Sequence, residues 1–230
     1  AELSKRPYGL VIISGPTGSG KSSTMAALID LINQTCSCHI ITLEDPIEYL
    51  HKHQKSLVNQ REIGSDTRSF ADGVHAALRE DPDVIVVGEM RDFETARTAL
   101  SAAETGHLVL ATMHAARAPQ AVSRIVDLFP LEHRPQACTQ LSSVVEGIVT
   151  QHLLRRQDRP GRVAACEVLL GTPEVREAIR TNKPQELYEA LKLGEDRGMI
   201  SLEKSLERLH RDGIISFQDA RSRDIVPACE

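Results

Sequence analysis

Four short apolar runs restrict the fold of this chain more than any other feature of its sequence. They cover residues 10–13, 40–43, 84–87 and 108–111, and each is continuous rather than alternating. Continuous runs of this kind are typical of strands buried on both faces of a parallel sheet. Helical patterns separate the runs, over residues 25–32, 69–80 and 92–105. Strand alternating with helix predicts an α/β core with a mainly parallel sheet.

The second half of the chain changes toward helices. After residue 115, helical patterns over residues 119–128 and 135–149 precede a short apolar strand at 163–170. The remainder has the pattern of helices, with Thr172 as an N-cap and Leu202, Leu206 and Leu209 forming a core-facing stripe. We therefore expect a core over residues 1–170 and a C-terminal helical subdomain over residues 171–230. The polar stretch 51–67 reads as a hairpin or a surface loop.

Composition excludes several classes of protein. The 230 residues are 41% hydrophobic and 26% charged, as in an ordinary soluble domain. Lys and Arg number 27 against 32 for Asp and Glu, a net charge of −5, so we expect no nucleic-acid partner. No apolar stretch reaches the ~20 residues of a transmembrane helix, and we expect none. Five cysteines without a Cys-x-x-Cys pair favour a reducing, cytoplasmic location.

A glycine-rich motif directly follows the first apolar run and precedes a helical pattern. It reads Gly-Pro-Thr-Gly-Ser-Gly-Lys-Ser and matches G-x-x-x-x-G-K-[ST] in full. In this context the main-chain N–H groups of the loop converge on phosphate oxygens, and the helix N-terminus adds positive potential. We predict that ATP and Mg²⁺ bind here, with Lys21 on the β and γ phosphates and Ser22 as a metal ligand. The predicted nucleotide-binding residues are Gly15, Pro16, Thr17, Gly18, Ser19, Gly20, Lys21, Ser22 and Ser23.

Acidic residues end two of the predicted strands. Glu44 follows the second run and Glu89 follows the third. Phosphoryl transfer needs one carboxylate to hold the metal and another to orient or deprotonate water, both at the carboxyl ends of strands beside the loop. We expect Glu89 to serve Mg²⁺ and Glu44 to activate water. The alternative is that such residues cap helices or turns, and for Asp92 we favour a helix cap.

Two histidines bracket the fourth apolar run. His107 precedes it and His114 follows it, so they lie at opposite ends of one strand. His114, at the carboxyl end, is placed to reach a γ-phosphate or to relay its presence to a neighbouring subunit. A purely structural role for His114 is the alternative. The arginines 155, 156, 159 and 162 read as a solvated face.

Taken together, these motifs resemble the secretion-type ATPases of type IV pilus and type II secretion machines. The resemblance rests on the phosphate loop, the acidic stretch 41–49, the strand end 83–92 and the histidine segment 105–114, in that order. It implies a RecA-like P-loop fold, with Glu44 as catalytic base, Glu89 serving Mg²⁺, and His114 functionally important. Within the family, the chain is similar to the ATPases that retract type IV pili, because it has no four-cysteine zinc module and residues 171–180 resemble their arginine-containing helix.

The resemblance also implies an assembly. Members carry an N-terminal domain that precedes this region, and we expect this chain to be a fragment that lacks it. The expected whole protein is a homohexameric, Mg²⁺-dependent ATPase, cytoplasmic and peripheral at the inner membrane, that retracts pili for twitching motility through a membrane platform protein. An accessory retraction ATPase or a secretion or assembly ATPase remains an alternative, as do, further off, a DNA-acting RecA-like motor and a non-hydrolysing nucleotide switch.

Overall fold

The computed structural model describes residues 2–221, which form one mixed sheet flanked by helices. The part of the predicted helical subdomain at residues 222–230 lies outside the described residues. The strands are β1 (Gly9–Ser14), β2 (His39–Glu44), β3 (Leu57–Glu62), β4 (Val84–Val87), β5 (Leu108–Met113), β6 (Val145–Arg155) and β7 (Arg162–Leu170). The helices are α1 (Lys21–Thr35), α2 (Phe70–Ala77), α3 (Phe93–Glu104), α4 (Ala118–Asp127), α5 (Arg134–Val144), α6 (Pro173–Arg180), α7 (Pro184–Leu193), α8 (Leu202–Arg211) and α9 (Phe217–Arg221).

The strand order across the sheet is β3-β2-β4-β5-β1-β6-β7. Every neighbouring pair is parallel except β6 and β7, which form an antiparallel hairpin. The predicted α/β fold with a mainly parallel sheet is therefore confirmed, and all four apolar runs lie in central strands. Because parallel strands run in the same direction, the carboxyl ends of β1, β2, β4 and β5 lie along the same edge of the sheet.

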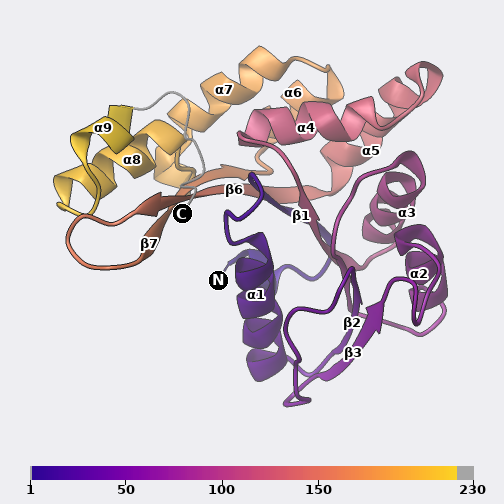
Figure 1. The fold of residues 1–230 in the computed structure, drawn as a ribbon. Coiled ribbons are helices and arrows are strands. Elements are labelled where there is room, and N and C mark those ends of the chain that lie inside the picture. Colours follow the sequence, from indigo (N-terminus) through magenta and orange to yellow (C-terminus); the bar gives the residue numbers. More distant parts are fainter. Residues whose placement is uncertain (1, 222–230) are drawn as a thin grey trace.

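The two faces of the sheet are covered unequally. On one face α1 packs Met25, Ile29 and Ile32 against alternate strand residues such as Val11 and Ile13. The other face is covered by α2 to α7, and the intervening strand residues, Leu10 and Ile12 among them, join a larger core there. Figure 1 shows α1 on one side of the strands and helices such as α3, α4 and α5 on the other. Burial on both faces explains why the strands are continuously apolar.

Two predicted element boundaries were wrong. The polar stretch 51–67 contains β3, which pairs in parallel with β2 and so is neither a hairpin nor a plain loop. The helical pattern at 135–149 stops at Val144, and β6 begins at Val145. The first error arose because β3 is an edge strand with polar residues. The second arose because the start of β6 has apolar spacing that fits a helix as well as a strand.

The helix caps follow the sequence signals. Asp92 accepts a hydrogen bond from the main-chain N–H of Thr95 at 2.9 Å, so the predicted cap of α3 is confirmed. Thr172 caps α6 in the same way, through the N–H of Val175.

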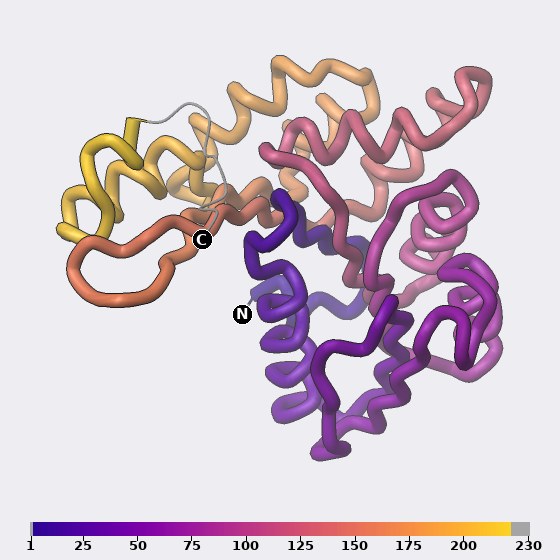
Figure 2. The backbone as a smooth tube through the Cα atoms, viewed as in Figure 1, coloured from indigo at the N-terminus to yellow at the C-terminus, as the bar shows by residue number. Residues whose placement is uncertain are grey.

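The β6–β7 hairpin extends beyond the rest of the sheet and carries the last helices. In Figure 2 this hairpin projects away from α1, with α8 and α9 lying along it. Leu154 and Ala165 of the hairpin pack against Leu202 and Leu206 of α8 in a small core of their own, which confirms the predicted stripe. Within residues 2–221, no helix combines the length and apolar character needed to cross a bilayer.

Candidate functional site

A cavity of about 590 Å³ opens at the carboxyl ends of the parallel strands. Its walls come from the loop between β1 and α1, the turn after β2, the ends of β4 and β5, and the β6–β7 hairpin. The structure brings together here most of the residues predicted from the sequence. Those that line the cavity are Thr17, Gly18, Gly20, Lys21, Ser22, Ser23, Glu44, Glu89 and His114.

The glycine-rich loop needs its glycines for two different reasons. Gly18 and Gly20 have φ values of +74° and +88°, a conformation that disfavours side chains. Gly15 is also crowded, since a Cβ there would lie 2.5 Å from Ser19 Oγ. Behind the loop, Ser19 is 2% exposed, and its hydroxyl has no hydrogen-bond partner. The loop is therefore shaped for close approach of its main chain to a ligand.

Lys21 lies half-buried over this loop. Its Nζ donates to the carbonyl oxygens of Gly15 and Pro16, each at 3.0 Å, and lies 3.5 Å from His114 Nδ1. Burial lowers the pKa of Lys21, and the negative charges of Glu89 and Glu48 partly oppose that effect. The ammonium group of Lys21 is placed to form an ion pair with an anionic ligand bound in the loop.

Glu89 extends the chain of polar contacts from Lys21. Its Oε1 lies 3.3 Å from His114 Nε2, and its Oε2 pairs with Arg91 at 2.6 Å. The hydrogen bond and charge of Glu89 raise the pKa of Arg91. His114 thus lies between the loop lysine and the carboxylate at the end of β4.

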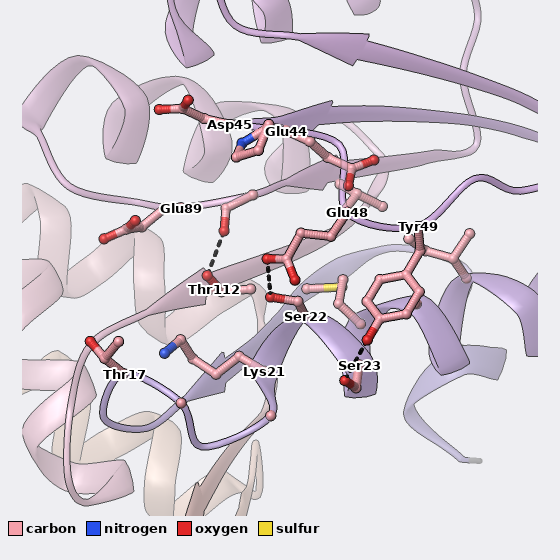
Figure 3. Close-up of a pocket in the computed structure, with 18 of the residues that line it drawn as sticks. Thr17, Lys21, Ser22, Ser23, Glu44, Asp45, Glu48, Tyr49, Glu89 and Thr112 are labelled. Carbon is pink, nitrogen blue, oxygen red and sulfur yellow. Dashed lines mark hydrogen bonds between the residues drawn. The ribbon is translucent and has the colours of Figure 1, made fainter. Parts of the chain in front are cut away.

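The end of β2 and the turn that follows it carry two glutamates, Glu44 and Glu48, with different surroundings. Glu44 lines the cavity, but its Oε1 accepts hydrogen bonds from Thr42 Oγ1 at 2.6 Å and Gln60 Nε2 at 2.9 Å. Glu48 accepts a hydrogen bond from Ser22 Oγ at 2.7 Å. Figure 3 shows Glu48 reaching toward Ser22, whereas the carboxylate of Glu44 points away from Lys21.

Glu48 lies in the acidic stretch 41–49, but no role was predicted for it from the sequence. The signal was present, because Glu48 follows Glu44 by four residues in the same segment. The conformation of the turn after β2 could not be predicted from the sequence. This turn brings Glu48 and Tyr49 into contact with the first turn of α1. There Tyr49 Oη lies 2.8 Å from Ser23 Oγ.

Three other residues of the hairpin were not predicted to belong to the site. Leu153 and Arg162 line the cavity from β6 and β7, and Gln151 holds the loop from beneath. Arg162 is therefore not only part of a solvated face. His107 lies at the other end of β5, where Nδ1 is 3.0 Å from the carbonyl oxygen of Ala102.

Comparison with known proteins matches residues 1–221 to the family model described as type II/IV secretion system protein. The chain belongs to this family. It is 47% identical over 225 residues to the type IV pilus retraction ATPase PilT of Pseudomonas aeruginosa, covering 98% of this chain and 65% of the relative. It is 45% identical over 218 residues to the type IV pilus ATPase PilU of the same organism, covering 95% of this chain and 56% of the relative.

A solved structure supports the same assignment. The crystal structure of the pilus retraction motor PilT with bound ADP superimposes with a TM-score of 0.90 at 51% identity, covering 97% of this chain and 64% of that one. The family and the fold predicted from the sequence motifs are therefore confirmed. The chain spans less than two thirds of the length of these relatives.

Proposed function

We propose that this chain is the ATPase domain of a motor that retracts type IV pili by hydrolysing ATP. The observation that carries the proposal is the connected set of Lys21, His114 and Glu89 over a phosphate-binding loop. Similarity to PilT and the ADP in its crystal structure support the same reading.

The residues of the loop fit a magnesium nucleotide. Lys21 would exchange its bonds to two loop carbonyls for the β and γ phosphates, and the N–H groups at the start of α1 would face phosphate oxygens. Ser22 and Glu48 already place a hydroxyl and a carboxylate 2.7 Å apart, and Glu89 adds a second carboxylate. Oxygen donors of this kind suit Mg²⁺, and Ser22 and Glu89 would hold it. When bound, the metal neutralises charge on the transferred phosphoryl group.

Activation of water is assigned to the turn after β2. Both Glu44 and Glu48 line the cavity there. Glu44 is restrained by Thr42 and Gln60, whereas Glu48 reaches the first turn of α1. We propose that one of these two carboxylates orients the attacking water, and the geometry favours Glu48. His114, between Lys21 and Glu89, is placed to contact the γ-phosphate and to hold Glu89 in position.

The wider assembly is proposed from the family. We expect a cytoplasmic retraction motor of this family to form a homohexamer and to have an N-terminal domain. Its expected binding partner is a platform protein at the inner membrane. We also propose a division into a core over residues 1–170 and a helical subdomain from residue 171, and the residues that line the cavity, from Thr17 to Arg162, all lie in the proposed core. An accessory retraction role is the second candidate, because PilU is similar to this chain at almost the same identity as PilT.

The test uses the full-length protein that contains this chain. We expect ATP hydrolysis in the unaltered protein, and a fall in turnover of about 100-fold or more in Glu48→Gln with ATP affinity nearly unchanged. Glu44→Gln is the matched variant, since it removes the other carboxylate of the same turn. If Glu44→Gln alone abolishes turnover, the role of base passes to Glu44. Normal turnover in both variants would remove both carboxylates from the mechanism. Nucleotide binding without hydrolysis in the unaltered protein would leave a nucleotide switch, and hydrolysis stimulated by DNA would favour a DNA motor.

Cells distinguish the two retraction roles. A retraction ATPase restores twitching to a strain that lacks its own, whereas an accessory ATPase does so only when the main motor is present. Failure to restore twitching in either background would contradict the pilus assignment.

A further inference from the structure

A buried carboxylate on β7 joins the segment that follows His114 to the C-terminal helices. Glu167 is fully buried. Its Oε1 accepts a hydrogen bond from the main-chain N–H of Ala118 at 2.6 Å, at the first residue of α4. Its Oε2 accepts from Arg117 Nε at 2.9 Å and from the N–H of Leu202, at the start of α8, at 3.3 Å. A charge buried this deeply persists only with such partners, so these contacts fix α4 and α8 relative to one another.

Arg117 connects the same point to two further side chains. Its Nη1 pairs with Glu203 of α8 at 2.8 Å, and its guanidinium lies 5.9 Å from the centre of the Tyr188 ring of α7. Burial works against the charge of Arg117, but the hydrogen bonds and charges of Glu167 and Glu203 outweigh it and raise its pKa. One side chain at the start of α4 thus contacts β7, α7 and α8.

The segment between His114 and Arg117 is short and held at several points. The ring of His152 on β6 hydrogen-bonds to the carbonyl oxygen of Ala116, with Nε2 at 2.8 Å. The side chain of Arg124 on α4 donates to the carbonyl oxygen of His114. At its other end the segment presents the His114 ring to Lys21 and Glu89. A shift of α4 relative to β7 would therefore move His114 within the nucleotide site.

We propose that Arg117 and Glu167 are positioning residues that hold His114 against Lys21 and Glu89 and couple this contact to α7 and α8. Neither residue lines the cavity, so they act through His114. Movement of the C-terminal helices would then change the rate of hydrolysis, and the terminal phosphate would in turn bias those helices. This inference rests on the proposed ATPase function.

The first experiment measures kcat and KM for ATP in the full-length protein. The variant Arg117→Met with Glu167→Gln removes both charges together and leaves no buried charge unpaired. We expect kcat to fall about tenfold while KM changes less than about twofold, because the loop that grips the phosphates is untouched. Arg197→Ala is the matched control, since it breaks an exposed pair with Glu174, also 2.8 Å long, near α6 and should leave both constants unchanged. Unaltered kcat in the folded double variant would overturn the inference.

A second comparison tests whether the junction acts through His114. In a His114→Ala background, adding Arg117→Met with Glu167→Gln should cause no further fall in kcat, because the contact to be positioned is already gone. If the two effects multiply instead, the coupling does not run through His114. If the double variant does not fold, Glu203→Gln replaces it, because this change removes only the exposed partner of Arg117. We then expect kcat to fall about two- to threefold. An unchanged kcat in Glu203→Gln would contradict the inference. Absence of hydrolysis in the unaltered protein would reject the proposed function instead.

Discussion

Gln151 donates its side-chain amide to the main-chain carbonyl of Ser19 at 2.7 Å, between two residues 132 positions apart in the chain. Its Oε1 accepts a hydrogen bond from Thr24 Oγ1 at 2.8 Å. Gln151 is itself buried in β6. The glycine-rich loop and the first turn of α1 are therefore fastened to the sheet by one amide.

Replacement of Gln151 should loosen the loop. In Gln151→Met the side-chain volume is kept, but the Ser19 carbonyl and the Thr24 hydroxyl lose their partners, at a cost of about 1–3 kcal/mol. We expect ATP affinity to fall about tenfold in a direct nucleotide titration, with the fold retained. Gln157→Met is the control, because Gln157 makes a similar amide-to-carbonyl bond, to Gly213, outside the cavity. Equal affinity in the unaltered protein and Gln151→Met would show that the loop is rigid without this clamp.

Nucleotide binding should take up protons at alkaline pH. Burial lowers the pKa of Lys21 below its ordinary value of 10.5 in the free protein. A bound triphosphate surrounds the ammonium with negative charge and raises that pKa, so protons are absorbed at pH values between the free and bound values. ATP affinity should accordingly decrease as pH rises through the lowered pKa of Lys21.

Calorimetry provides the measurement. Titrations with ATP at about pH 9, in two buffers with different heats of ionisation, should give different apparent enthalpies, with the sign of proton uptake. Lys21→Met should abolish the difference wherever binding is still detectable. Proton release in the unaltered protein would contradict the assignment of Lys21 to the phosphates.

A glycine in α2 allows β2 to lie close to that helix. A Cβ on Gly73 would lie 2.6 Å from Leu43 Cδ2, and Leu43 is fully buried immediately before Glu44. Gly73→Ala should therefore lower the free energy of unfolding by about 1–3 kcal/mol, although alanine favours helices more than glycine does. Urea denaturation measures the change.

Relief of the clash gives the matched test. Leu43→Ala alone opens a cavity, at a cost of about 2–5 kcal/mol. The double variant should be less destabilised than the sum of the two single variants, because the added methyl group fills part of the space left by Leu43. If the losses of unfolding free energy in the two single variants simply add in the double variant, contact with Leu43 is not what excludes a side chain at position 73.

The parts of the fold that could be predicted from the sequence are those set by local signals. Continuous, mainly apolar runs identified the central strands, because burial on both faces favours apolar residues at nearly every position. The phosphate loop could be located because Gly18 and Gly20 adopt positive φ and Lys21 follows directly. Asp92 was recognised as a cap because the cap depends only on its neighbours within α3.

The rest depends on contacts between distant segments. β3 is polar and exposed along one edge, so only its pairing with β2 defines it as a strand. The sequence predicted a role for Glu44 and none for Glu48, because the hydrogen bonds that distinguish them come from Gln60 and Ser22 on other elements. The junction at Glu167 is invisible in sequence for the same reason: its partners come from α4 and α8.

Arg162 should contribute to nucleotide affinity without affecting chemistry. It lines the cavity from the start of β7, and Leu153 lines it from β6 next to Gly20 of the loop, whereas the carboxylates and His114 lie at the ends of β2, β4 and β5. Leu153 offers an apolar surface, and the planar cation of Arg162 can stack on an aromatic ring, so we expect this pair to contact the base. Arg162→Ala should weaken ATP and ADP equally, by about three- to tenfold, and leave kcat unchanged at saturating ATP. Arg159→Ala removes a neighbouring arginine that does not line the cavity and should leave both affinities unchanged; a selective loss of ATP over ADP in Arg162→Ala would instead place this side chain at the γ-phosphate.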